Sequence, residues 1–360
     1  MRAQVRSLAL GSGMLYIQSQ IAPGPFELRQ DEIFGRARPE EEEKKMKCEW
    51  NEKTGELAFA SKRFKGILEP IVSGDRGDSV SHLLRNFAHK STSTLVSPDE
   101  VGYGPCRAGL FSLFKVLARG SYLTELRVVP PAMEILEDGV ELVWAPTLHH
   151  QARVECTFRF KEPNIVDVDL RVEGYGYYPD YELLVSAYLA PGFTPGVYVK
   201  GDEFTDAKPE QIRIVDHPTF HGMYLFFPRD QAASHMLTDG RGQSGRYYWR
   251  QAISRSYARP VIFSARGTVD AVVLGRPEDV LALGASYAGD EERDGVAAHR
   301  SLYVSLFGRD LHPGHGWRTQ VRLVVDDFGG REEVHMQLYE EFLAEVSSTE
   351  RMFRTNPKDV

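Results

Sequence analysis

Two histidines, His217 and His221, are the first residues whose type and spacing suggest chemistry. They lie four positions apart in the segment VDHPTFHGMYLFFPRD, which starts at Val215. On a helix this spacing would place both rings on one face, where they could hold a metal ion. Pro218, however, lacks a backbone N–H and disfavours helix at the residue before it. We therefore interpret the segment as a bend that leads into a strand at 223–227, with the two imidazoles just before the strand begins.

Other candidate acid and base groups are spread along the chain. An imidazole titrates near neutrality and can pass a proton to a ring oxygen or a carbon, while a carboxylate partner sets its tautomer or acts opposite it. Any one of these residues alone is more often structural than catalytic. The best combination is His217 and His221 with a carboxylate in one cleft. The candidate catalytic residues are His217, His221, Glu182, His150 and Glu203.

Two aromatic clusters suit carbohydrate recognition, which needs flat apolar faces and a few hydrogen-bonding groups. Tyrosines gather in EGYGYYPDYE (173–182), and tyrosine and tryptophan gather in GRYYWRQ (245–251). Each of these side chains carries a polar group on an apolar body. The alternative is that alternating aromatic side chains fill the core of a sandwich. The candidate substrate-binding residues are Arg107, Tyr178, Tyr248, Trp249, Arg250 and His149.

Metal and cofactor signals are weak. The turn HPGH, from His312 to His315, could hold a divalent ion together with Asp310, but this spacing is unspecific. The cysteines Cys48, Cys106 and Cys156 form no C-x-x-C pair and are expected to be free thiols. There is no phosphate loop, dinucleotide fingerprint or G-x-S-x-G elbow. We expect neither a bound metal nor a cofactor.

Composition limits the class of protein. The chain has 360 residues, 42% of them hydrophobic and 26% charged, which is ordinary for a globular protein. A net charge of -8 argues against a nucleic-acid partner. No apolar window of about 18 residues predicts a membrane span. We expect a cytoplasmic protein, with secretion left open because Arg2 and Arg6 precede a short apolar stretch. Met46 is an alternative start, and the oligomeric state is open.

The dominant hydrophobic period from Trp50 onward is two, which is typical of half-buried strands. The segment 153–161 alternates strictly, and so does 165–174 after the turn EPN, so the two predict an antiparallel hairpin with one solvated face. More than a dozen such segments exclude a βαβ architecture. They include 55–61, 109–117, 121–130, 132–146, 181–191, 196–201, 223–228, 246–253, 260–266, 268–275, 300–308 and 317–327.

The C-terminal part departs from this pattern. Apolar residues recur at near-helical spacing in 331–346, which predicts a helix that caps the sheets. Shorter helices are expected at 277–288 and 79–88. We expect an N-terminal extension at 1–46, partly disordered, one β-sandwich domain at 47–330, and a helix and tail at 331–360.

Several sparse motifs resemble the galactose-mutarotase-like β-supersandwich superfamily, which includes the aldose epimerases, and most closely an uncharacterised bacterial branch. They are WAPT, PNIVDVDL, YELLVSAY and HRSLYVSLFGRDLHPGHGWRTQVRLVV, within roughly 50–327. The resemblance implies an all-β fold, a large antiparallel supersandwich with a C-terminal helix. It also implies a carbohydrate ligand in a concave groove, with His217 and His221 standing for the epimerase histidines.

Three functional classes remain open from the sequence. The first is an enzyme of carbohydrate metabolism, either an isomerase of the sugar epimerase type, a glycosidase or a polysaccharide lyase, with histidine and carboxylate as acid and base. In a lyase, arginine would neutralise a uronic carboxylate. The second class is a carbohydrate-binding module without turnover, and the third is a structural or assembly role.

Overall fold

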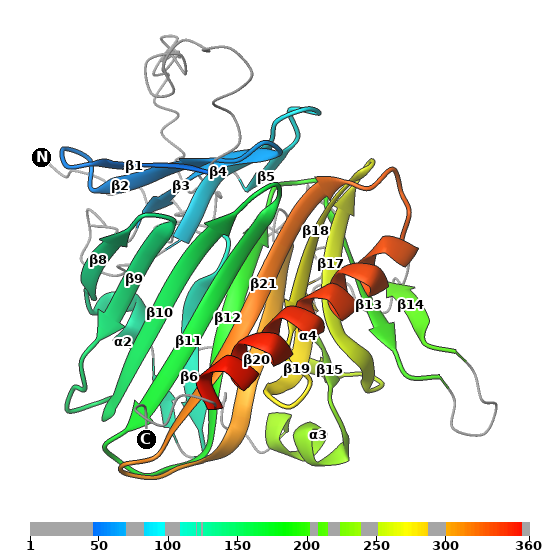
Figure 1. Cartoon of the computed structure of the whole chain (residues 1–360). Coiled ribbons are helices and arrows are strands. Elements are labelled where there is room, and N and C mark those ends of the chain that lie inside the picture. The colour runs from blue at the N-terminus through cyan, green and yellow to red at the C-terminus, as the bar shows by residue number, and fades with distance from the viewer. Residues whose placement is uncertain are drawn as a thin grey trace, which may run out of the picture. The chain divides into compact units, whose positions relative to one another are not determined.

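The computed structural model describes residues 46–69, 83–97, 109–119, 121–123, 125–201, 208–214, 224–238, 251–286 and 300–354. These residues lie in one compact unit, Glu43–Val360. Within them no helix is both long enough and apolar enough to cross a membrane. The fold is all-β, as predicted, because nearly every described segment of regular structure is a strand (Figure 1).

The described strands form three sheets. The first has five strands in chain order, β1–β2–β3–β4–β5. All its neighbouring strands are antiparallel. Its strands are β1 (Lys47–Asn51), β2 (Glu56–Ala60), β3 (Phe64–Glu69), β4 (Leu83–His89) and β5 (Leu95–Ser97).

The second sheet has nine strands in the order β14–β13–β17–β18–β21–β11–β10–β9–β8. The hairpin predicted around the turn EPN lies in it as β10 and β11, with Val154 opposite Val172 and Phe158 opposite Val168. The strands are β8 (Ala132–Leu136), β9 (Gly139–Trp144), β10 (Ala152–Lys161), β11 (Ile165–Gly174), β13 (Thr194–Val199), β14 (Glu210–Arg213), β17 (Tyr257–Arg266), β18 (Val269–Gly275) and β21 (Gly316–Asp327).

The third sheet has seven strands in the order β16–β15–β19–β20–β12–β6–β7. Its β15–β16 pair is parallel, whereas its other described pairs are antiparallel. The strands are β6 (Ser112–Ala118), β7 (Ser121–Leu123), β12 (Tyr178–Leu189), β15 (Tyr224–Pro228), β16 (Gln251–Ile253), β19 (Val280–Ser286) and β20 (Arg300–Leu311). The helices are α2 (Glu125–Val128), α3 (Gln231–Leu237) and α4 (Glu333–Arg354).

One large hydrophobic core joins the three sheets. Phe59 of the five-stranded sheet, Val168 of the nine-stranded sheet and Val185 of the seven-stranded sheet are all buried in it. Phe59 stacks on Phe160 with ring centroids 4.0 Å apart. Each sheet therefore packs one face against this core, and its other face is free to contact a helix, solvent or a ligand.

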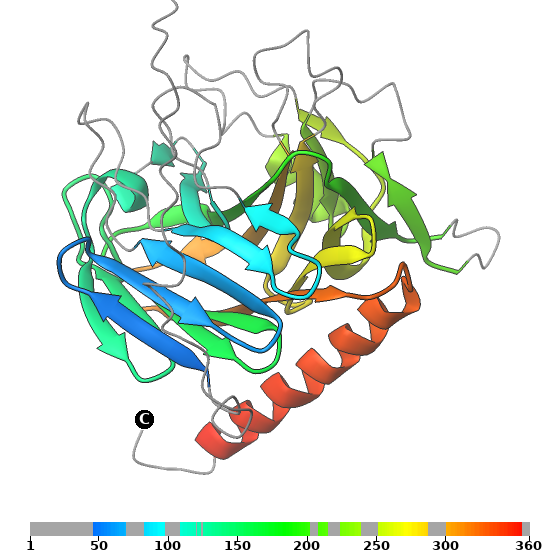
Figure 2. The same cartoon turned by 90° about the horizontal axis from the view of Figure 1, so that it is seen from above.

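Helix α4 covers the other face of the nine-stranded sheet (Figures 1 and 2). Its buried residues Tyr339 and Phe342 pack with Phe263, Val272 and Val324 in a second cluster. The predicted capping helix is therefore present. Its apolar stripe is supplemented by a buried histidine, His335, whose Nε2 lies 2.8 Å from Asp270 Oδ2.

The solvated face predicted for the segment 165–174 is only partly correct. Asp167 was expected to face water, but it is fully buried. Its carboxylate makes two hydrogen bonds with Arg322, from Nε at 2.6 Å and from Nη2 at 2.9 Å. The difference arises because α4 lies over this face: Arg322 also donates to Glu345 of the helix at 2.5 Å. A carboxylate can be buried in this way only because a cation is buried with it.

Two predicted elements are wrong in type, and a third is too long. The helix expected at 277–288 is strand β19, and the helix expected at 79–88 is strand β4. All seven residues of β19 are buried, so apolar side chains on both faces remove the alternation that marks a strand. The strand expected at 121–130 ends at Leu123 and is followed by α2.

Replacing Gly139 by alanine is expected to destabilise the fold strongly. A Cβ at Gly139 would lie 1.8 Å from the carbonyl oxygen of Phe158, and backbone cannot move aside as a side chain can. We expect a loss of about 3 kcal/mol in the free energy of unfolding, measured by urea titration. Gly267→Ala is the control, because nothing lies within 4 Å of its Cβ position and only its φ of +63° is unfavourable. Its expected loss is about 1 kcal/mol, and equal losses in both variants would contradict the clash.

Candidate functional site

The candidate site is the face of the seven-stranded sheet that points away from the large core. Side chains alternate between the two faces of a strand. In β12, Leu183 and Val185 belong to the large core, so Glu182 and Ser186 project from the opposite side. We call this side the outer face. This outer face carries a smaller hydrophobic cluster, in which Leu184 and Tyr303 are grouped with Ala233 and Leu237 of α3. A buried carboxyl group beside this cluster needs an explanation other than apolar packing.

Neighbouring strands add polar groups to the outer face. On β20, Ser305 lies opposite Leu184, and its Oγ donates a hydrogen bond to Glu182 Oε1 at 2.7 Å. Glu182 is only 1% exposed. Ser186 Oγ is also buried, and it has no hydrogen-bond partner among the described residues. A buried hydroxyl without a partner costs free energy, so it marks a place where a ligand group or a water can bind.

A second set of hydroxyls continues the outer face toward β19. Tyr303 lies opposite Ser186. The Ser301 hydroxyl donates to Tyr303 Oη at 2.9 Å, and Ser286 Oγ is 2.7 Å from Ser301 Oγ. Tyr188 Oη lies 3.5 Å from Tyr303 Oη. Burial raises the pKa of Tyr303 well above its ordinary value, so this phenol stays protonated and can donate or accept hydrogen bonds.

Lys115 is the functional candidate that sequence reasoning missed. It lies on β6 opposite Leu184, so it is a diagonal neighbour of Glu182 on the outer face. Such neighbours have Cβ atoms roughly 7–8 Å apart. Lys115 is 4% exposed, and burial, together with the positive charge of Arg127, lowers its pKa to about 6. Its amine is therefore mostly neutral at pH 7 and can accept a proton. The available signal was a single lysine inside the apolar run SLFKVLA.

Unusual backbone flanks Glu182 on both strands. Asp180 has φ 51°, and on β20 Phe307, which pairs with Glu182, has φ 76°. The register of β12 against β20 shifts between Tyr181 and Glu182. A positive φ costs about 1–2 kcal/mol for a residue other than glycine. Bulges and such strained residues concentrate next to functional sites, where they redirect a side chain. Both features lie within two residues of Glu182 or directly opposite it.

His150 and Tyr178 lie on the core side of β12 and not on the outer face. His150 Nε2 is 3.1 Å from the hydroxyl of Tyr181, which belongs to the large core. Burial lowers the pKa of His150 to about 4, so the ring is neutral at pH 7. Tyr178 is buried too and accepts a hydrogen bond from the Gln151 backbone N–H at 2.7 Å. His149 is exposed beside them. The structure therefore does not bring these residues together with Glu182.

The other predicted site residues lie outside the described part of the chain. This group includes His217 and His221, so the expected cleft that combines them with a carboxylate stays a prediction. Its members are His217, His221, Glu203, Arg107, Tyr248, Trp249 and Arg250. The third cysteine, Cys106, is also outside, whereas Cys48 and Cys156 are free thiols.

The HPGH turn does not form a metal cluster. Among the described residues, no group of three or more histidine, cysteine, aspartate or glutamate side chains is placed to hold a metal ion. The His312 and His315 rings are 5.7 Å apart and nearly perpendicular. Asp310 Oδ2 instead accepts a hydrogen bond from Tyr177 at 3.0 Å.

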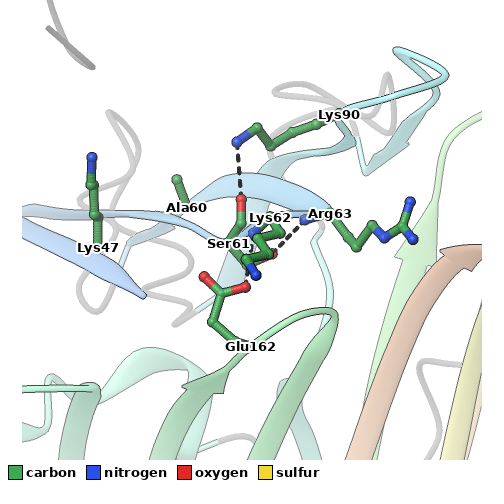
Figure 3. A pocket seen from close by; sticks show the side chains of 7 residues that line it. All are labelled: Lys47, Ala60, Ser61, Lys62, Arg63, Lys90 and Glu162. Atoms are coloured by element: carbon green, nitrogen blue, oxygen red, sulfur yellow. Dashed lines mark hydrogen bonds between the residues drawn. The ribbon is translucent and has the colours of Figure 1, made fainter. Parts of the chain in front are cut away.

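A cation-rich hollow of about 360 Å³ lies beside the five-stranded sheet. Figure 3 shows Lys47 and Lys90 on either side of it, with Glu162 below Ser61. Glu162 Oε2 accepts the Lys62 backbone N–H at 2.9 Å, and Lys90 Nζ donates to the Ser61 carbonyl at 3.0 Å. The lining residues are Lys47, Ala60, Ser61, Lys62, Arg63, Lys90 and Glu162. This hollow suits a small anion, but it contains no tyrosine, no histidine and none of the predicted site residues.

A second hollow, of about 470 Å³, lies beside α3. Its polar groups already serve the local backbone: Asp230 caps α3 by accepting the Ala233 N–H, and Arg255 donates to the Lys200 carbonyl. It is lined by Lys200, Gly201, Pro228, Asp230, Gln231, Ser234, Ser254, Arg255 and Ser256. Because neither hollow pairs a carboxyl group with a buried base, the outer face around Glu182 is the stronger candidate.

Comparison with known proteins finds likeness in solved structures alone. No protein-family model and no curated protein matches the chain. A GH36 α-galactosidase from Geobacillus stearothermophilus is 14% identical over 78% of this chain and 41% of that one, with a TM-score of 0.43. A putative aldose 1-epimerase from Klebsiella pneumoniae is 10% identical over 82% of this chain and 85% of that one, with a TM-score of 0.38. A heparan sulfate lyase from Pedobacter heparinus is 8% identical over 78% of this chain and 36% of that one, with a TM-score of 0.42.

This chain and the solved structures are alike in the arrangement of their strands. These structures include aldose epimerase homologues. The chain spans about two fifths of the length of the galactosidase structures that it matches. At such identities and TM-scores, nothing about the site or its ligand follows from them.

Proposed function

We propose that the protein binds a carbohydrate on the outer face of the seven-stranded sheet, at Glu182 and Lys115, and acts on it by acid/base chemistry. The observation that carries the proposal is the buried polar row on this face, in which a carboxyl group and a mostly neutral amine are diagonal neighbours. A sugar presents many hydroxyls that both donate and accept hydrogen bonds. The row offers matching partners in Glu182, Lys115, Ser186 and Tyr303.

Acid/base chemistry fits the two ionisable groups. Above about pH 6 the Lys115 amine can accept a proton from a hydroxyl or an acidic C–H group. Glu182 is held by Ser305 and can bind a sugar hydroxyl or exchange a proton. Burial excludes water, which strengthens each of these interactions. This division of roles suits an epimerase, a glycosidase or a lyase.

The predicted residues outside the described part of the chain keep their proposed roles. His217, His221 and Glu203 are proposed as further acid and base groups. Arg107, Tyr248, Trp249 and Arg250 are proposed to contact the sugar. The solved structures with a similar strand arrangement are named for carbohydrate enzymes: an α-galactosidase, an aldose 1-epimerase and a heparan sulfate lyase.

Glu182→Gln is expected to weaken carbohydrate binding at least tenfold while leaving the fold intact. Glutamine keeps the shape and an oxygen acceptor for Ser305, but it removes the carboxyl group that can exchange a proton. Binding is measured by isothermal titration with malto-, xylo-, cello-, chito- and galacto-oligosaccharides and with oligogalacturonates. We expect at least a tenfold rise in Kd, which corresponds to about 1.4 kcal/mol.

The same titrations separate an enzyme from a binding module. Saccharides that bind are incubated with the protein and followed by NMR for anomer exchange, epimerisation, new reducing ends or unsaturated products. Turnover that disappears in Glu182→Gln supports the enzyme, and binding without turnover supports the module. The matched control is Glu173→Gln, a half-exposed carboxylate on β11. If no saccharide binds to the parent protein, or if Glu182→Gln binds like the parent, the proposed site is wrong.

A further inference from the structure

The exposed residue Tyr177 directly precedes β12, the strand that carries Glu182. The ring of Tyr177 is 54% exposed. It is not free to turn, because its hydroxyl donates to Asp310 Oδ2 at 3.0 Å and its ring lies 4.9 Å from the His312 ring at an angle of 31°. An immobilised aromatic face with a carboxylate and an imidazole at its side matches the alternating C–H and hydroxyl surface of a sugar ring.

The backbone beneath Tyr177 is rigid for an exposed turn. The Gly174 N–H donates to the His315 carbonyl at 2.8 Å, and the Gly314 N–H donates back to the Gly174 carbonyl at 2.8 Å. The Tyr175 N–H donates to the Gln151 carbonyl at 2.9 Å. The turns that follow β11 and β20 therefore lie side by side, as Figure 1 shows. A ligand that binds here would lose little binding free energy in ordering the loops.

Polar contacts connect this turn with the candidate site. The Asp180 N–H donates to Asp310 Oδ1 at 3.0 Å, and the Asp180 carboxylate pairs with the guanidinium of Arg119. Arg119 follows β6 directly and is four residues beyond Lys115, which is roughly 13 Å along a strand. Tyr177 is five residues before Glu182, roughly 16 Å at full extension. Either span is longer than one pyranose ring.

We infer that the carbohydrate site continues from Glu182 onto a rim formed by Arg119, Tyr177, Asp310 and His312, and that its ligand is a neutral oligosaccharide of at least three sugar units. This inference rests on the proposed function. The rim bears two carboxylates, Asp180 and Asp310, beside one guanidinium, so its charge opposes a polyanionic chain. Hydroxyl groups of a neutral chain can instead bond to each of these side chains.

The test is the dependence of affinity on chain length. The parent protein and the variants Tyr177→Ala and Tyr175→Ala are titrated with the di-, tetra- and hexasaccharide of each neutral series and of oligogalacturonate. Tyr175 is the matched control, because it is equally exposed at 54% and its hydroxyl turns to Glu173 of β11. We expect Tyr177→Ala to raise the Kd of the hexasaccharide about tenfold and that of the disaccharide by less than about twofold. Tyr175→Ala should change neither.

The outcomes distinguish the rim from the site beneath it. If parent affinity does not grow with chain length, or if both tyrosine variants behave alike, the rim is wrong while disaccharide binding still supports Glu182. Binding confined to oligogalacturonate would overturn the neutral ligand. Self-association that Tyr177→Ala removes, with saccharide affinity unchanged, would assign the rim to a second copy of the chain. If no saccharide binds to the parent, the proposed function itself fails.

Discussion

Lys115→Met is expected to make the protein more stable at pH 7 and to remove carbohydrate binding. A buried lysine costs free energy because its charged form loses hydration. Methionine has a similar length and loses nothing on burial. A residue that destabilises the fold but supplies a group for ligand binding is the signature of a functional site. A purely structural lysine would show loss of stability on replacement.

The pH dependence gives the sign of this effect. Burial lowers the pKa of Lys115 from 10.5 to about 6 in the folded state, so between these values the unfolded chain binds more protons. The stability of the parent must therefore rise with pH through this window. Below about pH 6 the full free-energy cost of burying the charged Lys115 amine applies, with an upper bound of about 6 kcal/mol. We expect Lys115→Met to gain about 3 kcal/mol at pH 7 and to approach the parent near pH 10.5.

Urea titrations between pH 6 and pH 10 measure this difference. Lys53→Met, at an exposed turn residue, is the control and should be neutral at every pH. A less stable Lys115→Met at pH 7 would mean that the lysine is charged and well paired in the folded protein. A variant that is more stable but still binds saccharide as the parent does would remove Lys115 from the site.

Arg322→Met is expected to destabilise the protein by about 3–5 kcal/mol. The Arg322 side chain is 3% exposed and makes a bidentate contact with Asp167, whose side chain is fully buried. Its guanidinium also lies 5.2 Å from the centre of the Phe342 ring in α4. Without Arg322, the buried carboxylate keeps one cation among the described residues, Lys161, whose side chain is 40% exposed. The helix would also lose the hydrogen bond that Arg322 of β21 donates to Glu345.

A double variant separates the cost of an orphaned charge from the value of the ion pair. Asp167→Leu with Arg322→Met removes both charges, and we expect it to recover most of the lost stability. Arg159→Met is the control, because its pair with Asp138 is about 40% exposed on both sides and contributes less than about 1 kcal/mol. A single Arg322→Met variant as stable as the parent would show that the pair does not hold α4.

Acid titration of the same variants has a defined direction. The hydrogen bond from Arg322 lowers the pKa of Glu345 below its ordinary value of 4.5. The stability from this contact is therefore present above pH 4.5 and is lost as pH falls through the lower, folded pKa. Arg322→Met should lack this part of the acid sensitivity.

Local pattern in the sequence determined much of the fold. The strict alternation of 153–161 and 165–174 led to β10 and β11 in the predicted pairing, and the helical period after residue 331 led to α4. Such signals are reliable because one face of each element meets apolar side chains and the other meets water. They failed for β19, which is buried on both faces.

The site depended on tertiary structure. Residue type alone singled out Glu182, but strand order decided that it shares a face with Lys115 and Ser305 while His150 lies on the opposite side of β12. The local signal for Lys115 is weak, a single lysine inside the apolar run SLFKVLA, because its lowered pKa comes from burial in the folded sheet. Local sequence pattern determined most of the segments that become strands, but it missed β4 and β19 and the burial of Asp167. Only the stacking of the sheets decided which polar side chains are buried together, since that burial is a property of neighbours that the chain brings close only after it folds.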